Sequence, residues 1–426
     1  MELDQGNTAF LLIAAALVLL MTPGLAFFYG GLVKAKSVIS MMMLSFGAMG
    51  LIGVLWVLYG YAITFSNAGV GNFVGIDGVL GIDLDQLGLQ GAFNEATGTD
   101  FAAAYPTLAF AAFQATFAII TVALISGAIA DRAKFGAWMV FAGVWATVVY
   151  FPVASWVFNF TLTDGKVSDG GWIAYVIGAN DFAGGTAVHI NAGAAALALA
   201  LVLGKRVNFA KGVHKPHNPP FVLLGAGLLW FGWFGFNAGS ELAADGIAAI
   251  AFLNTIAAPA AAILGWLVVE KIKDGKPTSV GAASGAVAGL VAITPACNIL
   301  TPFWAIVLGI LVGAICAVAI DLKFKLGFDD SLDVVGIHLV GGLIGTLYIG
   351  LLGNNVGLFF GFGAEQLGKQ AIAAFAVLIY SFVLSYIIGL IIEKTMGFRV
   401  KNEDEIAGID TVVHGEEGYI LLEETR

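Results

Sequence analysis

The stretch DFAGGTAVHINAG, residues 181–193, decides how this chain folds. It is mostly apolar, yet it begins with an aspartate and carries His189 eight positions later. A second stretch, DSLDVVGIHLVGG at residues 330–342, repeats this spacing, with Asp330 eight positions before His338. Ionisable residues inside apolar segments are rare and usually functional, so the two stretches indicate one site built from both halves of the chain.

The composition around these stretches predicts a membrane protein. Of the 426 residues, 59% are hydrophobic and 11% are charged, a balance that a water-soluble domain could not easily hide from solvent. Apolar runs of about 20 residues, the length that crosses about 30 Å of hydrocarbon, recur along the chain. The expected membrane helices are 8–31, 40–64, 104–129, 136–160, 182–204, 220–240, 246–269, 279–296, 301–320, 333–351 and 370–393.

The charges between these runs predict an orientation. The first run lacks the features of a cleaved leader and is kept as a helix. The segments that follow the odd-numbered helices are basic, with Lys34, Lys36, Arg132, Lys134, Lys205, Arg206, Lys211, Lys215, Lys271, Lys273, Lys276, Lys323, Lys325, Lys394, Arg399 and Lys401. The opposite segments hold Lys166 and Lys369, and the long connection at 66–103 is acidic. The positive-inside rule therefore predicts an outer N-terminus and a cytoplasmic C-terminus.

The two histidine stretches also predict an inverted repeat. The first begins the fifth helix, which runs inward, and the second begins the tenth, which runs outward. Blocks of five helices must have opposite orientations, a construction that many transporters use. Eight residues of helix rise about 12 Å, so both histidines are expected near the membrane centre. The predicted fold is an all-α polytopic membrane protein with a 5+5 inverted repeat and one further C-terminal helix.

The polar residues of the repeats have structural interpretations as well as functional ones. A single histidine could simply bond to a neighbouring helix, but two at matched depth favour a pore. Asp330 and Asp333 are expected to be structural helix caps. Asp181 is either a cap or an anion that raises the cation concentration at the outer entrance.

Other chemistries find no support in the sequence. No metal-ligand spacing accompanies the histidine pair, and no nucleophile or cofactor loop appears, so neither a metal, a cofactor nor an enzyme is predicted. The remaining histidines, His214, His217 and His414, fall in predicted cytoplasmic segments. The two cysteines, Cys297 and Cys316, are expected to pack in apolar surroundings. No basic run resembles a nucleic-acid footprint.

Five motifs resemble the ammonium transporter family, which includes the methylammonium permeases and Rhesus proteins. They are TPGLAFFYGGL (22–32), FQATF (113–117), DFAGGTAVHINAGAAALALALVLGKR (181–206), WFGFNAGS (233–240) and DVVGIHLVGG (333–342). The resemblance covers the membrane region and reaches the tail. It implies a homotrimer in the plasma membrane, with eleven helices and a separate pore in each subunit.

The resemblance also implies roles for individual residues. His189 and His338 match the two pore histidines, and Phe117 and Phe236 match the phenylalanines that close the outer end of the pore. The implied outer recruitment site for the ammonium ion consists of Ser240, Phe113, Gln114, Phe117, Phe158 and Asp181. Ring faces attract cations by about 0.5 to 2 kcal/mol per contact, and a hydroxyl accepts an N–H bond, so these residue types suit ammonium.

One position departs from the family pattern. Relatives commonly have tryptophan six positions after the proline of the fourth helix, where this chain has Phe158. Trp156 lies two positions earlier, and Trp172 could supply an indole from the following loop. Phenylalanine holds a cation less strongly than tryptophan, which affects the affinity expected of the outer site.

The chain is expected to comprise an eleven-helix channel domain, 1–396, and a cytoplasmic regulatory tail, 397–426. The composition of the tail alone also fits a disordered end. The resemblance instead implies an ordered tail, with Gly397 and Asp410 in its motifs, that couples subunits to a PII-type signalling protein.

The predicted function is ammonium uptake. The ion would bind outside and lose its proton, and ammonia would pass the phenylalanines and histidines, with or without separate proton transfer. Two alternatives are an ammonium sensor and an electroneutral gas channel of the Rhesus type for ammonia or carbon dioxide. A sensor would normally carry an added signalling domain, and the outer serine and aromatic residues favour a charged substrate.

Overall fold

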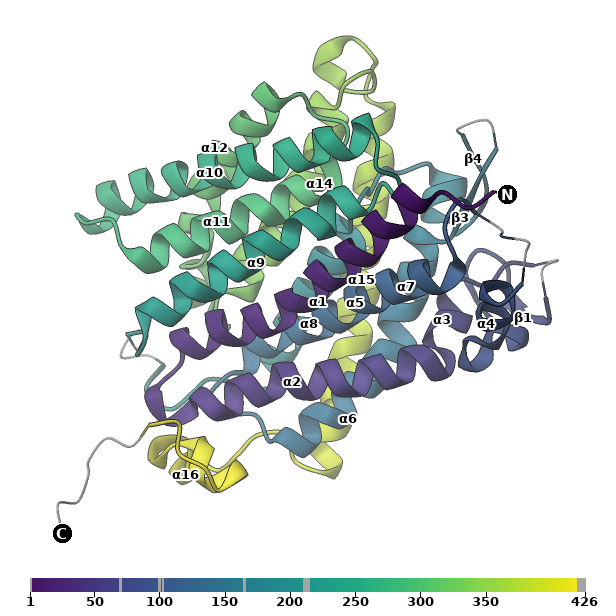
Figure 1. The fold of residues 1–426 in the computed structure, drawn as a ribbon. Helices are drawn as coiled ribbons and strands as arrows, with labels where there is room; N and C mark the ends of the chain where they lie inside the picture. Colours follow the sequence, from purple (N-terminus) through teal and green to yellow (C-terminus); the bar gives the residue numbers. More distant parts are fainter. Residues whose placement is uncertain are drawn as a thin grey trace.

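The computed structural model describes residues 2–68, 71–98, 101, 103–163, 166–209 and 215–419. Lys211 and His214, together with tail residues 420–426, lie outside the described residues. Within the described part, eleven helices are long and apolar enough to span a membrane, which confirms the predicted number. The helices lie roughly side by side in one bundle (Figure 1).

The first five spans are built from α1 (Gln5–Leu32); η1 (Ala35–Ser37), α2 (Val38–Leu55), η2 (Trp56–Gly60) and α3 (Tyr61–Thr64); α5 (Thr107–Ile125) and η4 (Ser126–Ile129); α6 (Phe135–Trp145), η5 (Ala146–Tyr150) and α7 (Phe151–Phe158); and η7 (Gly185–Ile190) and α8 (Asn191–Leu203). The other six are α9 (Pro219–Gly239); α10 (Gly246–Asp274); α11 (Ser279–Ile293) and η9 (Thr294–Ala296); α12 (Pro302–Ala319) and α13 (Leu322–Leu326); η10 (Val335–Leu339) and α14 (Val340–Leu352); and α15 (Glu365–Thr395). Most ends agree with the predicted spans to within a few residues. The exceptions, such as the end of α10 and the start of α15, are polar extensions of an apolar helix.

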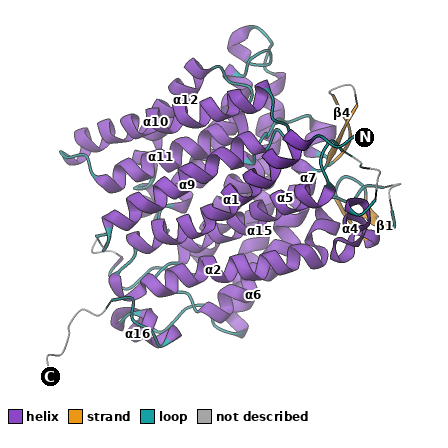
Figure 2. Ribbon diagram, in the orientation of Figure 1, coloured by secondary structure: helices purple, strands orange, loops and turns teal. Residues whose placement is uncertain are grey.

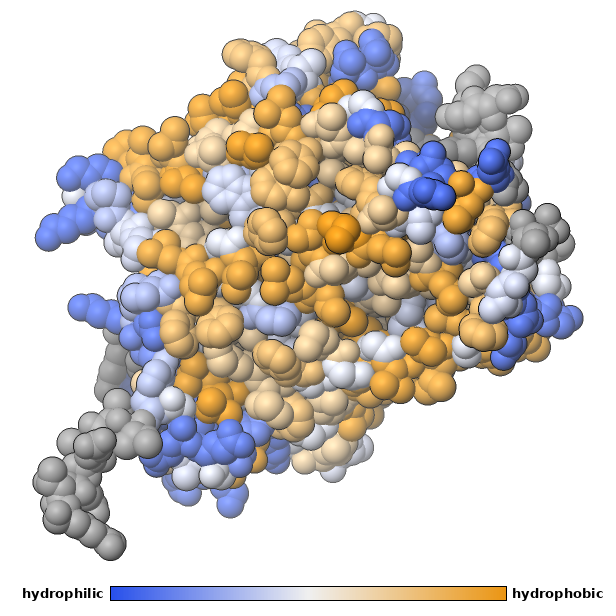
Figure 3. Space-filling view, in the orientation of Figure 1, coloured by the Kyte–Doolittle hydropathy of each residue, from blue (hydrophilic) through white to orange (hydrophobic). Residues whose placement is uncertain are grey.

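The surface agrees with a membrane-embedded bundle. In the view of Figure 3, apolar side chains cover the middle of the bundle, and hydrophilic side chains gather at its two ends. Exposed apolar side chains such as Ile13, Leu264 and Ile379 lie on the spans α1, α10 and α15. A belt of this kind is what lipid solvates, so the exposed apolar surface requires no protein partner to explain it.

Close packing between spans depends on small residues. A Cβ on Gly225 of α9 would lie 2.2 Å from the backbone nitrogen of Phe28 in α1. Likewise, a Cβ on Gly309 of α12 would lie 2.2 Å from the carbonyl oxygen of Ala258 in α10. Only glycine allows these backbones to approach so closely, as expected where lipid provides no hydrophobic drive for helix association.

The helices that carry the histidines begin later than predicted. They start at Gly185 and Val335, several residues after the aspartates, and each opens with a π-helical segment that contains its histidine. The expectation of a continuous helix from aspartate to histidine is therefore wrong. Gly184 has a φ of 110° and Asp333 a φ of 65°, and these left-handed residues interrupt the helical backbone just before each start.

Two small hairpins, absent from the predicted fold, lie at one end of the bundle (Figure 2). Strands β1 (Phe73–Ile76) and β2 (Leu80–Asp83) form one, followed by η3 (Leu84–Leu89) and α4 (Gln90–Ala96). Strands β3 (Phe160–Thr163) and β4 (Lys166–Gly170) form the other and precede η6 (Ile173–Ile177). The Trp172 backbone nitrogen donates to the Gly78 carbonyl at 3.0 Å and so joins the second hairpin to the turn of the first.

The tail packs against the opposite end of the bundle (Figure 1). It contains α16 (Asn402–Ala407) and η12 (Asp410–His414), and Phe398 is fully buried. The Asp410 carboxylate accepts from the backbone nitrogens of Ile39 at 3.0 Å and Ser40 at 2.7 Å, at the start of α2. The described part of the tail is thus ordered, in contrast to what its composition alone allows.

Candidate pore and outer vestibule

The two repeat histidines contact each other in the centre of the bundle. The Nδ1 atoms of His189 and His338 are 3.3 Å apart, and the ring centroids are 5.3 Å apart with the planes tilted by 26°. Both side chains are buried. Since the facing atoms are both Nδ1, one ring must donate and the other accept, so a neutral pair has complementary tautomers. The Nε2 atom of His189 is buried without a hydrogen-bond partner among the described residues.

The Asp181 carboxylate fixes the start of the helix that carries His189. It accepts four backbone bonds, from Gly184 at 3.0 Å, Gly185 at 2.5 Å, Thr186 at 2.8 Å and Ala187 at 3.2 Å. It also accepts a bond from the Thr186 hydroxyl. These donors are the orphan N–H groups of the first helical turn, which a carboxylate satisfies and whose positive dipole end it complements.

The aspartates before the second histidine behave differently from each other. Asp330 is buried and accepts from the Val335 backbone nitrogen at 2.7 Å, which is a cap of the kind expected. Burial raises the pKa of Asp330 to about 6. The carboxylate of Asp333 does not cap the helix as predicted, because it instead accepts from the Lys323 ammonium at 2.6 Å.

A narrow apolar cavity runs beside the histidine pair. It is lined by Met21, Leu25, Phe28, Ile120, Leu124, Val188, His189, Leu229, Trp233, Phe236, Val287 and His338. Its free volume is about 10 Å³, at the lower limit of the space that holds one water molecule. Apart from the imidazoles and the Trp233 indole, the lining side chains offer no polar group to a passing molecule.

Trp233 positions one face of His189. The two rings stack with centroids 5.4 Å apart and a tilt of 23°. The indole nitrogen of Trp233 donates to the Thr294 hydroxyl at 2.8 Å, inside the bundle. Because a buried indole N–H needs a partner, this bond fixes the tryptophan, and the tryptophan in turn limits the orientations of the imidazole.

The two predicted gate residues form a closed pair. The rings of Phe117 in α5 and Phe236 in α9 are stacked, with centroids 4.2 Å apart and a tilt of 27°. Phe236 lines the narrow cavity, and Phe117 lines a wider cavity on the side of the hairpins. The stacked rings therefore separate the two cavities in this conformation.

The wider cavity, here called the vestibule, has a volume of about 120 Å³. It is lined by Tyr105, Phe110, Gln114, Phe117, Phe158, Phe160, Phe182, Ser240 and Leu242. Four predicted recruitment residues, Gln114, Phe117, Phe158 and Ser240, are among them. The Ser240 hydroxyl donates to the Phe236 carbonyl at 2.8 Å, which leaves its oxygen free to accept.

Three other candidates for the outer site do not line the vestibule. Phe113 is fully buried and packs its ring against Phe117, with centroids 4.9 Å apart. Asp181 is occupied by the backbone bonds described above. The Trp172 indole packs against Trp156, with centroids 5.5 Å apart, and does not replace Phe158 in the wall.

Sequence reasoning missed five vestibule residues and the tryptophan that stacks on His189. Tyr105, Phe110, Phe160, Phe182 and Leu242 fall outside the recognised roles, and several lie in loops whose paths the sequence does not predict. Trp233 had a detectable signal, because it stands three positions before Phe236 and so on the same helix face.

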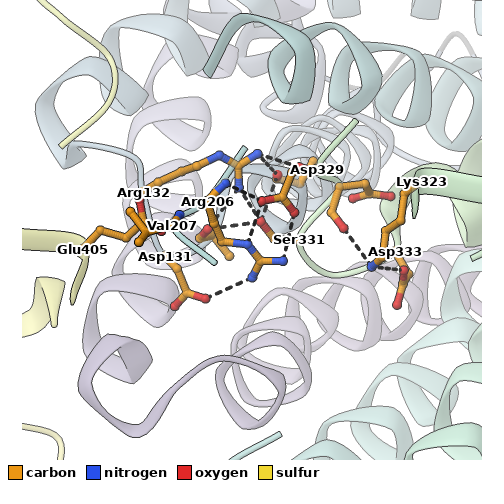
Figure 4. Close-up of polar contacts among 12 residues, drawn as sticks. Asp131, Arg132, Arg206, Val207, Lys323, Asp329, Ser331, Asp333 and Glu405 are labelled. Atoms are coloured by element: carbon orange, nitrogen blue, oxygen red, sulfur yellow. Dashed lines mark hydrogen bonds and ion pairs between the residues drawn. The ribbon is translucent and has the colours of Figure 1, made fainter. Parts of the chain in front are cut away.

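A buried charged cluster lies at the tail end of the bundle (Figure 4). Arg206 bonds to Asp329 at 2.9 Å and to Asp131 at 3.1 Å. Burial acts to raise the pKa of Asp329, but the hydrogen bonds and charges of Arg206 and Arg132 outweigh it and hold the pKa below its ordinary value. Glu405 of the tail accepts from the Val207 backbone nitrogen at 2.6 Å, so this cluster joins the tail to the membrane domain.

Within the described residues, eleven apolar helices and a narrow cavity between several of them are typical of a polytopic membrane transport protein. The chain belongs to the Ammonium Transporter Family, whose model matches residues 9–419. It is accordingly a multi-pass protein of the cell membrane, and the family is one of transporters rather than enzymes.

Similar proteins cover nearly the whole chain. An ammonium transporter of Mycobacterium tuberculosis is 54% identical over 98% of this chain and 90% of its own length. An ammonium transporter of Bacillus subtilis is 44% identical over 98% of this chain and 99% of its own length. Among solved structures, Candida albicans Mep2 has a TM-score of 0.84 and 30% identity, and covers 100% of this chain and 95% of its own. A sensor Amt protein has a TM-score of 0.85 and 27% identity, with 96% and 98% coverage.

Proposed function

We propose that the protein takes up ammonium by binding the ion in the vestibule, removing its proton and passing ammonia along the histidine pair. The vestibule suits the charged form, because it combines aromatic rings with the free Ser240 oxygen. The narrow cavity suits the neutral form. The stacked pair of Phe117 and Phe236 would open between them and admit a molecule of ammonia's size.

The small apolar cavity at the histidines carries this proposal. At about 10 Å³ it has no room for a hydrated ion, and its lining offers few groups to replace the lost hydration. A charge in such surroundings is expensive, whereas ammonia is neutral and can bond to an imidazole nitrogen. Potassium cannot lose its charge and is therefore expected to be excluded.

The histidine pair offers a separate route for the proton. Its Nδ1 atoms are within hydrogen-bonding distance, and imidazole both accepts and donates protons near neutral pH. Once the stacked pair opens, the ion can give its proton to the unpaired Nε2 atom of His189. His189 then releases its Nδ1 proton to His338, which releases its own Nε2 proton on the far side. We infer that the proton follows the ammonia along this pair, so that each cycle moves one net positive charge.

We further propose that the N-terminus and the hairpins lie outside the cell and the tail in the cytoplasm. The basic segments follow the odd-numbered spans, and the positive-inside rule sets the orientation accordingly. The bundle has its N-terminus and its tail at opposite ends (Figure 1). A homotrimer and a PII-type partner at the tail belong to the same proposal and rest on family membership.

Ion selectivity in proteoliposomes tests the function. The purified protein should dissipate an ammonium gradient and leave an equal potassium gradient intact. The double variant His189→Asn, His338→Asn should admit potassium, because the asparagine amides can bind water and ions in the cavity without taking up protons. Potassium flux through the unmodified protein at the ammonium rate would overturn the proposal.

A further inference from the structure

The outer wall of the vestibule comes from segments outside the membrane helices. Tyr105 lies just before α5, and Phe160 is the first residue of β3. The Tyr105 ring stacks on Phe110, with centroids 6.2 Å apart and a tilt of 24°. Phe110 packs edge-on against Phe65, which directly follows the second span, with centroids 4.8 Å apart. These contacts hold Tyr105 at the cavity without using its hydroxyl.

Two polar side chains at the vestibule have no protein partner. Gln114 is 7% exposed, and its amide makes no hydrogen bond within the described part of the chain. The Tyr105 hydroxyl is likewise unpaired among the described residues. Both groups line the vestibule, where no protein donor uses their lone pairs, so both are suited to a ligand that donates hydrogen bonds.

We propose that Tyr105 and Gln114 bind the incoming ammonium-type cation together with Ser240, and that Phe160 forms an aromatic wall of the same site. The inference rests on the proposed function and extends it, because it gives the vestibule an outer half built by segments outside the membrane helices. An ammonium ion has four N–H donors, and Ser240 accepts one of them. The Gln114 carbonyl and the Tyr105 oxygen supply two further acceptors, and ring faces can receive the rest.

The tyrosine acts as a neutral acceptor over the physiological range. Burial raises the pKa of Tyr105 to about 12, so its hydroxyl keeps its proton at neutral pH. The site therefore holds a cation by lone pairs and ring faces, without a carboxylate among its lining residues. Such a site favours N–H donors over spherical ions of the same charge, because hydrogen bonds to a lone pair are directional.

The test is the concentration dependence of ammonium flux in proteoliposomes of the full chain. Tyr105→Phe removes only the hydroxyl and should raise the half-saturating ammonium concentration by about three- to tenfold, the size expected for one hydrogen bond. The maximal flux should stay unchanged, because the gate and the histidines are intact. Tyr175→Phe is the matched control, since Tyr175 is exposed and does not line the vestibule.

A second variant makes the assignment sharper. Tryptophan holds a cation more strongly than phenylalanine, so Phe158→Trp should reduce the effect of Tyr105→Phe in the double variant. If Tyr105→Phe misfolds, Phe160→Leu should still raise the half-saturating concentration.

An unchanged half-saturating concentration in folded Tyr105→Phe would overturn the inference, as would a shift of the same size in Tyr175→Phe. The proposed function would survive that outcome if the unmodified protein still transports ammonium and Ser240→Ala weakens its saturation. Absence of ammonium flux from the unmodified protein would instead remove the proposed function itself.

Discussion

Replacing Asp181 by asparagine tests how the protein positions His189. The asparagine oxygen can keep the bonds from Gly184 and Gly185, which both reach Oδ1. Its amide group then faces the Thr186 and Ala187 nitrogens, which lose their acceptor on Oδ2. Each lost hydrogen bond to a charged group costs about 1.5 to 3 kcal/mol, so Asp181→Asn should lower the free energy of unfolding by about 3 to 6 kcal/mol.

The assay pairs thermal unfolding of the purified protein with ammonium flux in proteoliposomes. We expect the Tm to fall by about 5 °C or more, because each kcal/mol of lost stability lowers the Tm of a chain of this size by about one to two degrees. Flux should fall at least tenfold, since the π-helical turn with His189 begins at the residues that lose their cap.

Asp330→Asn is the matched control at the other repeat. The Asp330 carboxylate accepts a backbone bond from Val335 on its Oδ2, and its Oδ1 has no hydrogen-bond partner among the described residues. Asparagine can keep that bond, so the loss should be about 1 kcal/mol or less. Equal losses in the two variants, or normal Tm and flux in Asp181→Asn, would refute the assignment of Asp181 as the cap that positions the pore.

Three further changes test other parts of the structure. Thr294→Val removes the acceptor of the Trp233 indole and should reduce flux several-fold, whereas Thr294→Ser should restore it; equal flux in both variants would contradict the positioning role. Asp329→Asn leaves Arg206 buried with fewer partners and should cost about 3 kcal/mol in thermal unfolding at pH 7. Because the folded pKa of Asp329 is lowered, its contribution is present above about pH 4 and is lost as the pH falls through the folded pKa, so the variant should lose less stability than the parent on acidification. Gly397 has a φ of 70°, so Gly397→Ala should strain the start of the tail by about 1 kcal/mol, and Gly397→Asn by less; flux that falls with alanine and is largely kept with asparagine would connect tail geometry to transport.

The membrane spans were predictable because they depend on a strong local signal. An apolar run long enough to cross the hydrocarbon has few other structures open to it. The pairing of His189 with His338 also followed from the sequence, since equal spacing in two inverted halves brings equivalent positions together. The exact helix starts did not follow, because the left-handed residues at Gly184 and Asp333 interrupt apolar runs that otherwise read as continuous.

The vestibule was only partly predictable, for a different reason. Gln114 and Phe117 stand on α5, and Ser240 directly follows α9, so all three keep a fixed spacing to the gate. Tyr105 reaches the same cavity from the connection before α5, and Phe160 reaches it from strand β3 of a hairpin with weak local signals. Phe113 shows the opposite error, because a residue one helical turn from Phe117 lay behind the site rather than in it.

The measurement that tests the central claim most directly is charge movement in proteoliposomes on a rapid ammonium pulse, with lumenal pH recorded in parallel and no imposed voltage. The account predicts a transient inward positive current that is absent from empty liposomes, and a current on an equal potassium pulse only in the double variant His189→Asn, His338→Asn. A lumen that turns alkaline without any current would contradict the proton route through the histidines and would indicate passage of neutral ammonia alone.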